Sequence, residues 1–285
     1  MNHHRFGRTR RDVAAIGQGT WNLEQGSRRE AVAALRRGLD LGMTHIDTAE
    51  MYGAGEAEKI VAEAIAGRRD EVFLVSKVLP ENASRKGAIR ACEKSLKRLK
   101  VERLDCYLLH WRESIPLAET IAAFDELEKA GKIRAWGVSN FDVGDLDEAL
   151  AIAGPGRIAC NQVLYHVEQR GIEHAVLPWC ETHGVALVGY TPFGRRFPGP
   201  GSAGGRVLAE IAAAHGGAAH GATPRQVALA FLVRRPSLFA IPKASSAAHT
   251  ADNAGAGKLR LTAAELARID AAFSRGAPPR ALPTL

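Results

Sequence analysis

Short apolar runs, often β-branched, recur along the chain and alternate with longer stretches in which apolar residues repeat every three or four positions. The short runs are typical of buried strands, and the longer periodicity is typical of helices that cover one face of a sheet. Regular alternation of the two predicts a parallel α/β sheet. The eight predicted strands span residues 14–19, 44–48, 72–77, 104–110, 135–140, 159–164, 186–191 and 239–243.

Helical periodicity fills the segments between these strands. Six predicted helices span residues 28–41, 56–66, 84–99, 117–130, 142–153 and 172–183. Two more follow the seventh strand, at 206–214 and 224–234, the second with Thr223 as N-cap and Pro224 at its first position. Thr262 and Glu265 form a capping box, which predicts an extra helix over 262–273 outside the sheet.

Eight strand–helix units in 285 residues favour a (β/α)8 TIM barrel that forms a single domain over residues 1–285. Alternation alone does not prove closure, so an open doubly wound sheet is the alternative architecture. Before the first strand, residues 5–13 are expected to form a short hairpin that plugs the barrel floor.

Polar residues gather where the predicted strands end, which is the face on which barrels of this kind carry their chemistry. Asp47, Lys77 and His110 end three successive strands, and Tyr52 follows Asp47 in a short loop. Neighbouring strands lie about 5 Å apart, so one pocket can hold all four side chains. A lysine paired with a carboxylate is expected to lower the pKa of a nearby tyrosine, which would make Tyr52 a general acid, while His110 orients a carbonyl oxygen.

Composition excludes several other classes of protein. The chain is 46% hydrophobic and 24% charged, with a net charge of +7, and its arginines are dispersed instead of forming a basic stripe with interleaved aromatics. Nucleic-acid binding is therefore not expected. No apolar run approaches the roughly 20 residues of a membrane span, which predicts a cytoplasmic protein without membrane contact. The four widely spaced cysteines have no metal-ligand spacing and are expected to be buried thiols, with no metal bound.

Several motifs, in order over nearly the whole chain, resemble the aldo-keto reductase superfamily. They are GQGTW (17–21), HIDTAEMYG (45–53), LVSKV (74–78), YLLHW (107–111), GKIRAWGVSNF (131–141), NQVLYH (161–166) and IPKASS (241–246). The LHW, NQVLYH and IPKASS variants most resemble bacterial members of the methylglyoxal reductase type. This resemblance implies hydride transfer from a nicotinamide cofactor to a carbonyl carbon, with Asp47, Tyr52, Lys77 and His110 as the catalytic tetrad.

The resemblance also implies where cofactor and substrate bind. Ser139, Asn140 and Gln162 match the groups that bind the nicotinamide carboxamide, and Tyr190 matches the aromatic that stacks on its ring. Trp21, Trp111 and Asn82 are expected to line the substrate pocket. The remaining positions expected at the adenosine end of the cofactor are Lys243, Ser245, His249 and Asn253.

Two departures from the family pattern qualify these expectations. Ala244, His249 and Asp252 stand where the family usually has Ser, Arg and Glu, so NADPH is expected to be preferred over NADH, but less strongly than with an arginine. The tail that often covers the substrate is reduced to residues 276–285, which predicts an open pocket.

The sequence thus predicts a monomeric, NADPH-dependent reductase of small aldehydes and ketones, including methylglyoxal and aromatic or aliphatic aldehydes. A non-catalytic NADPH-binding regulatory module on the same fold is the alternative. A metal-dependent isomerase or hydrolase is a third, since fold does not fix function.

Overall fold

Eight short parallel strands form the centre of the computed structural model, which describes residues 1–216 and 221–285. They neighbour one another in chain order from β3 to β10. Their bounds are β3 (Gln18–Gly19), β4 (His45–Asp47), β5 (Phe73–Val78), β6 (Cys106–Leu109), β7 (Trp136–Ser139), β8 (Ile158–Leu164), β9 (Ala186–Tyr190) and β10 (Leu238–Ala240). Each lies within or close to a strand predicted from the sequence.

The first and last strands meet, so the sheet closes into a barrel. Parallel bridges join Ile16 to Ala240 and Gly19 to Lys243, and the Gly17 N–H donates to the Ala240 carbonyl at 2.8 Å. The predicted (β/α)8 barrel is therefore confirmed, and the open doubly wound sheet is wrong.

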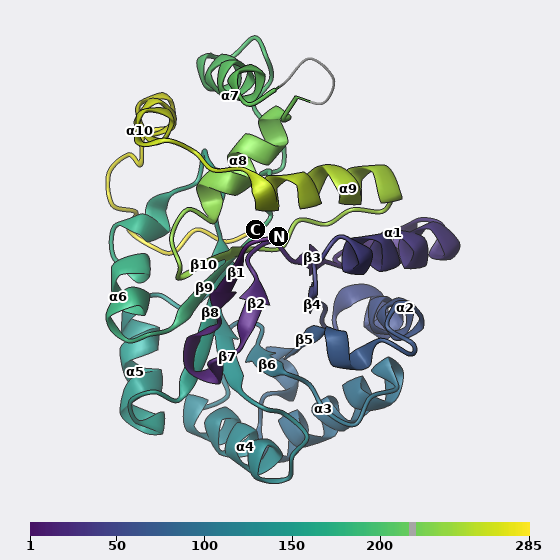
Figure 1. Cartoon of the computed structure of the whole chain (residues 1–285). Coiled ribbons are helices and arrows are strands. Elements are labelled where there is room, and N and C mark those ends of the chain that lie inside the picture. The colour runs from purple at the N-terminus through teal and green to yellow at the C-terminus, as the bar shows by residue number, and fades with distance from the viewer. Residues whose placement is uncertain (217–220) are drawn as a thin grey trace.

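Helices surround the barrel on its outside (Figure 1). Their bounds are α1 (Arg28–Asp40), α2 (Glu56–Ala64), α3 (Arg85–Leu99), α4 (Leu117–Lys129), α5 (Val143–Ala153), α6 (Val176–Thr182), α7 (Ala203–Ala214), α8 (Pro224–Leu232), α9 (Ala247–Gly255) and α10 (Ala263–Ala272). Both predicted caps form: Thr223 and Gln226 make a capping box at α8, as do Thr262 and Glu265 at α10. The main apolar core lies between these helices and the strands, and the four free cysteines are all buried, as expected.

The amino-terminal segment differs from its prediction. Strands β1 (His3–Arg5) and β2 (Asp12–Ala14) pair antiparallel, so residue 14 belongs to the hairpin and not to the barrel strand. Phe6, at the turn, is fully buried against Phe73 and Phe239, with ring centroids 4.6 and 4.9 Å away. The hairpin thus closes one end of the barrel, as expected, but it spans residues 3–14 instead of 5–13 (Figure 1).

Two helices also begin at other residues than expected. Ser202 accepts a hydrogen bond from the Gly205 N–H and starts α7 three residues before the predicted position. A separate 3-10 turn, Gly171–Glu173, delays the start of α6 to Val176. Within the described ranges, no helix is both long enough and apolar enough to cross a membrane.

Candidate active site

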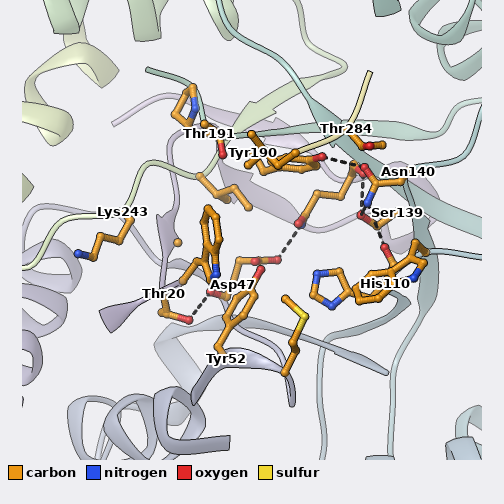
Figure 2. Close-up of a pocket in the computed structure, with 18 of the residues that line it drawn as sticks. Thr20, Asp47, Tyr52, His110, Ser139, Asn140, Tyr190, Thr191, Lys243 and Thr284 are labelled. Atoms are coloured by element: carbon orange, nitrogen blue, oxygen red, sulfur yellow. Dashed lines mark hydrogen bonds between the residues drawn. The ribbon is translucent and has the colours of Figure 1, made fainter. Parts of the chain in front are cut away.

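A cavity of about 860 Å³ opens at the carboxyl ends of the barrel strands. Loops from most of the barrel contribute to it, because parallel strands all end on this face. Figure 2 shows the residues that line it, with polar side chains at its centre. Among them are Asp47, Tyr52, His110, Ser139, Asn140, Gln162, Tyr190 and Lys243, all selected from the sequence.

Lys77 joins Asp47 and Tyr52 into one buried group. Its Nζ donates to Asp47 Oδ1 at 2.5 Å, to the Thr48 carbonyl at 2.9 Å and to the Tyr52 hydroxyl at 3.3 Å, so all three ammonium hydrogens have acceptors. The Lys77 and Asp47 side chains are 0% and 1% exposed. The ammonium is therefore held between a carboxylate and a phenol, away from water.

The loop that carries Tyr52 depends on two glycines. After Tyr52 the backbone turns left-handed, with φ of 56° at Gly53 and 92° at Gly55. A Cβ on Gly53 would lie 2.5 Å from the Glu24 side chain, and one on Gly55 would lie 2.5 Å from the Arg98 side chain. Glycine is thus favoured at both positions by backbone conformation and by close packing.

Burial sets the protonation of the tyrosine. It raises the pKa of Tyr52 above its ordinary value, and the nearby Lys77 ammonium offsets only part of that rise. The expected lowering of the Tyr52 pKa is therefore wrong, because the desolvation of the phenol outweighs the attraction of the ammonium. Burial also works to lower the pKa of Lys77, but Asp47 and Tyr52 outweigh it and raise that pKa. At neutral pH the site holds a protonated phenol beside a charged ammonium.

His110 faces Tyr52 edge-on, with ring centroids 5.8 Å apart. Burial, assisted by the Lys77 charge, lowers the pKa of His110 to about 2, so its ring is neutral. Its Nδ1 is buried and has no hydrogen-bond partner among the described residues. A neutral ring with one N–H can donate to a carbonyl oxygen without adding charge to the site.

A second polar group lies beside the first and is linked to it. The Tyr190 hydroxyl donates to Asn140 Oδ1 at 2.9 Å, and Asn140 Nδ2 donates to the His110 carbonyl at 3.1 Å. The Ser139 hydroxyl donates to the Gln162 carbonyl at 2.8 Å. Gln162 Nε2 donates to Asp47 Oδ2 at 2.8 Å, which ties this group to the buried ion pair (Figure 2).

The positions expected at the adenosine end lie at and beyond the rim of the cavity. Lys243 lines it, whereas Ser245, His249 and Asn253 lie on or just before α9 and are not lining residues. Ser246 caps this helix by accepting from the His249 N–H. Asn253 is 4% exposed, and its amide makes no side-chain hydrogen bond within the described residues.

The walls of the cavity agree only in part with the sequence. Trp21, which is 46% exposed, and Trp111 line the cavity as expected. Asn82 does not line it, because its amide donates to Glu50 and holds the loop after β5 instead. Lining residues that the sequence reasoning missed are Thr20, Asn22, Met51, Arg112, Asp145, Phe193, Thr284 and Leu285. Asn22 and Arg112 directly follow recognised motifs, whereas no local sequence pattern marks Thr284 and Leu285. The short tail thus returns to the pocket and does not leave it fully open.

No group of three or more His, Cys, Asp and Glu side chains is placed to hold a metal ion within residues 1–216 and 221–285. The acid–base groups of the cavity are instead a tyrosine, a lysine, an aspartate and a histidine.

Comparison with known proteins places these features in context. The family model described as aldo/keto reductase family matches residues 15–273. The chain is 46% identical over 265 residues to methylglyoxal reductase YeaE of Escherichia coli (strain K12), covering 92% of this chain and 91% of that protein. An aldo-keto reductase from Klebsiella pneumoniae in complex with NADPH matches with a TM-score of 0.90 and 43% identity, covering 100% of this chain and 99% of that chain. A structure from the same organism in complex with NADP and acetate has a TM-score of 0.91 and 42% identity over 100% of both chains.

Proposed function

The chain belongs to the aldo/keto reductase family, and on that premise we propose that it reduces small aldehydes and ketones, methylglyoxal among them, with NADPH and with Tyr52 as proton donor. The observation that supports this most directly is the buried line from Asp47 through Lys77 to Tyr52. A phenol beside a fixed ammonium can give up its proton because the resulting phenolate is stabilised where it forms.

Each of the four residues has a separate task in this proposal. Tyr52 keeps its proton in the resting site, since burial raises its pKa, and transfers it to the carbonyl oxygen of the substrate. Lys77 stabilises the phenolate, and Asp47 holds Lys77 in place. The neutral His110 orients the same carbonyl oxygen with a ring N–H.

The residues of the cavity fit NADPH. Lys243 has no carboxylate within ion-pair distance in the described part of the chain, and Ser246, three residues after it, caps the start of α9, which favours an anionic phosphate. The half-buried ring of Tyr190 lines the cavity, and the amide of Asn253 has hydrogen-bonding capacity left over. Ser139, Asn140 and Gln162 would hold the carboxamide, Tyr190 the nicotinamide ring, and Lys243, Ser245, His249 and Asn253 the adenosine end. When bound, the cofactor supplies the hydride that reduces the carbonyl carbon.

Methylglyoxal is proposed as a substrate because the E. coli relative is named a methylglyoxal reductase and aligns over most of both chains. The cavity of about 860 Å³ also leaves space for larger aldehydes against Trp21, Met51 and Phe193.

The test follows NADPH absorbance while the purified protein is offered methylglyoxal, an aromatic aldehyde and a simple sugar. Wild type is expected to oxidise NADPH with at least one of them. Tyr52→Phe is expected to bind NADPH as wild type does, measured by quenching of tryptophan fluorescence, but to turn over about 10² to 10⁴ times more slowly. Tight NADPH binding without turnover in wild type would favour the regulatory module, and wild-type turnover in Tyr52→Phe would remove Tyr52 from the mechanism.

A further inference from the structure

One side of the cavity is lined by charged residues that belong to a partly exposed cluster rich in carboxylates. The loop after β6 and the first turn of α5 supply Trp111, Arg112 and Asp145 to the lining. Glu113 and Glu148 lie directly behind these residues and bond to them. We call Glu113, Asp145 and Glu148, together with Arg112, the acidic wall: three carboxylates and one guanidinium, with a formal net charge of −2.

Most of the hydrogen-bond donors on this wall are already bonded to carboxylates. The only donor of the Trp111 side chain, Nε1, bonds Glu113 Oε1 at 3.0 Å. Arg112 Nη1 bonds Asp145 Oδ1 at 2.8 Å and Glu148 Oε2 at 2.7 Å, and its Nη2 bonds Glu148 Oε1 at 3.2 Å. A substrate carboxylate or phosphate that reached this wall would have to share Arg112 with two carboxylates that already bind it.

Among the described lining residues, no cation besides Arg112 lies on this side. All three hydrogens of the Lys77 ammonium are already donated within the site. Lys243 lies across the cavity from His110 in the view of Figure 2, at the end that the cofactor phosphate would occupy. The lining near this wall also includes the apolar side chains of Trp21 and Met51, both partly exposed, and the uncharged Asn22.

From this arrangement we propose that the acidic wall selects uncharged carbonyl substrates and rejects those that carry a carboxylate or a phosphate, which rests on the reductase function proposed above. Like charges facing each other disfavour the wrong substrate, and a buried anion without a donor is disfavoured as well. Arg112, Asp145 and Glu148 are partly exposed, with side-chain exposures of 29%, 28% and 46%. Their effect is therefore moderate and weakens with salt.

The experiment compares 4-nitrobenzaldehyde with 4-carboxybenzaldehyde, which are close in size and shape but differ by one negative charge at neutral pH. Steady-state kcat/KM is measured for both at saturating NADPH and low ionic strength. The ratio of the anionic to the neutral substrate is then compared between wild type and Glu113→Gln/Glu148→Gln. Each glutamine keeps one oxygen acceptor, so the wall loses two charges, keeps the bond from Trp111 and keeps one of the two bonds from Arg112 to residue 148.

We expect the double variant to raise the ratio roughly fourfold, about twofold for each charge removed, and the rise to shrink in about 0.5 M salt. The matched control is Glu93→Gln/Glu210→Gln, which removes the same two charges from surface pairs with Lys132 and Arg268 on the outer helices. The control is expected to leave the ratio as in wild type. An unchanged ratio in the wall variant, or an equal rise in the control, would overturn the proposal. Failure of wild type to reduce 4-nitrobenzaldehyde, methylglyoxal and the simple sugar would instead overturn the reductase function.

Discussion

Removing the Lys77 ammonium while keeping its bulk tests the buried ion pair in stability and in activity. In Lys77→Met, Asp47 keeps its bond from Gln162 but loses the only cation beside it, in a position that is 1% exposed. Breaking a buried pair on one side costs about 3–5 kcal/mol, because the remaining charge is left uncompensated. That is a large share of the roughly 5–15 kcal/mol by which a protein of this kind is stable.

Removing both charges separates the structural effect from the catalytic one. In Asp47→Asn/Lys77→Met neither charge of this pair remains, and the new amide oxygen at position 47 can still accept from Gln162. We expect most of the lost stability to return, since replacing both members of a buried pair is often close to neutral. Activity is expected to stay about 10² to 10⁴ times below wild type in both variants, because no ammonium stabilises the phenolate of Tyr52.

The assay is urea unfolding, followed by tryptophan fluorescence, alongside NADPH-dependent reduction of an aromatic aldehyde. Lys132→Met is the matched control: Lys132 pairs with Glu93 at the surface, and its loss should change the free energy of unfolding by only about 0.5 kcal/mol or less. Wild-type stability in Lys77→Met would refute the ion-pair reasoning. Wild-type activity in the double variant would refute the role given to Lys77.

Three further predictions concern acid stability, the cofactor phosphate and metals. His45 is fully buried with both ring nitrogens unpaired among the described residues, and burial lowers its pKa to about 4. The free energy of unfolding is therefore expected to fall as pH falls from about 6.5 to 4, because the unfolded chain binds the proton more readily. His45→Leu should remove about 2 kcal/mol of the loss measured by urea unfolding between pH 7 and 5. An equally steep loss in His45→Leu would contradict this. NADPH is expected to bind more tightly than NADH, and His249→Ala is expected to weaken the binding of NADPH but not of NADH, because only NADPH carries the phosphate that His249 would contact. Equal effects of the substitution on both cofactors would exclude a contact from His249. EDTA is expected to leave turnover unchanged, since the carbonyl oxygen is assigned to Tyr52 and His110, and inactivation that one divalent ion reverses would oppose that assignment.

Residues at strand ends could be placed from the sequence because parallel strands impose their geometry. Once the strands carrying Asp47, Lys77 and His110 were recognised as neighbours, their carboxyl ends had to meet on one face. The same holds for Ser139 and Gln162, which are directly paired across β7 and β8. For these side chains, local apolar patterns were sufficient to predict proximity.

Other features depend on contacts between segments that share no pattern. Arg112 meets Asp145 and Glu148 only because the loop after β6 lies against α5. Thr284 and Leu285 reach the cavity although the residues before them show no periodicity that would predict their path. The hairpin residue Ala14 was assigned to the barrel because its apolar run continues into the barrel strand without a break. Tertiary packing decides each of these cases, and no local signal records it.

The same burial that contradicts the expected tyrosine pKa strengthens the role proposed for Tyr52. A phenol with a lowered pKa would lose its proton to solvent at working pH before a substrate arrived, whereas the buried Tyr52 keeps it. The unfavourable species is then the phenolate left after proton transfer, because a desolvated site disfavours its charge. Lys77 addresses that step: its ammonium lies 3.3 Å from the hydroxyl, and Asp47 raises its pKa so that it remains charged despite burial. The ion pair therefore acts chiefly after the proton has left, which is why its removal should slow turnover without preventing NADPH from binding.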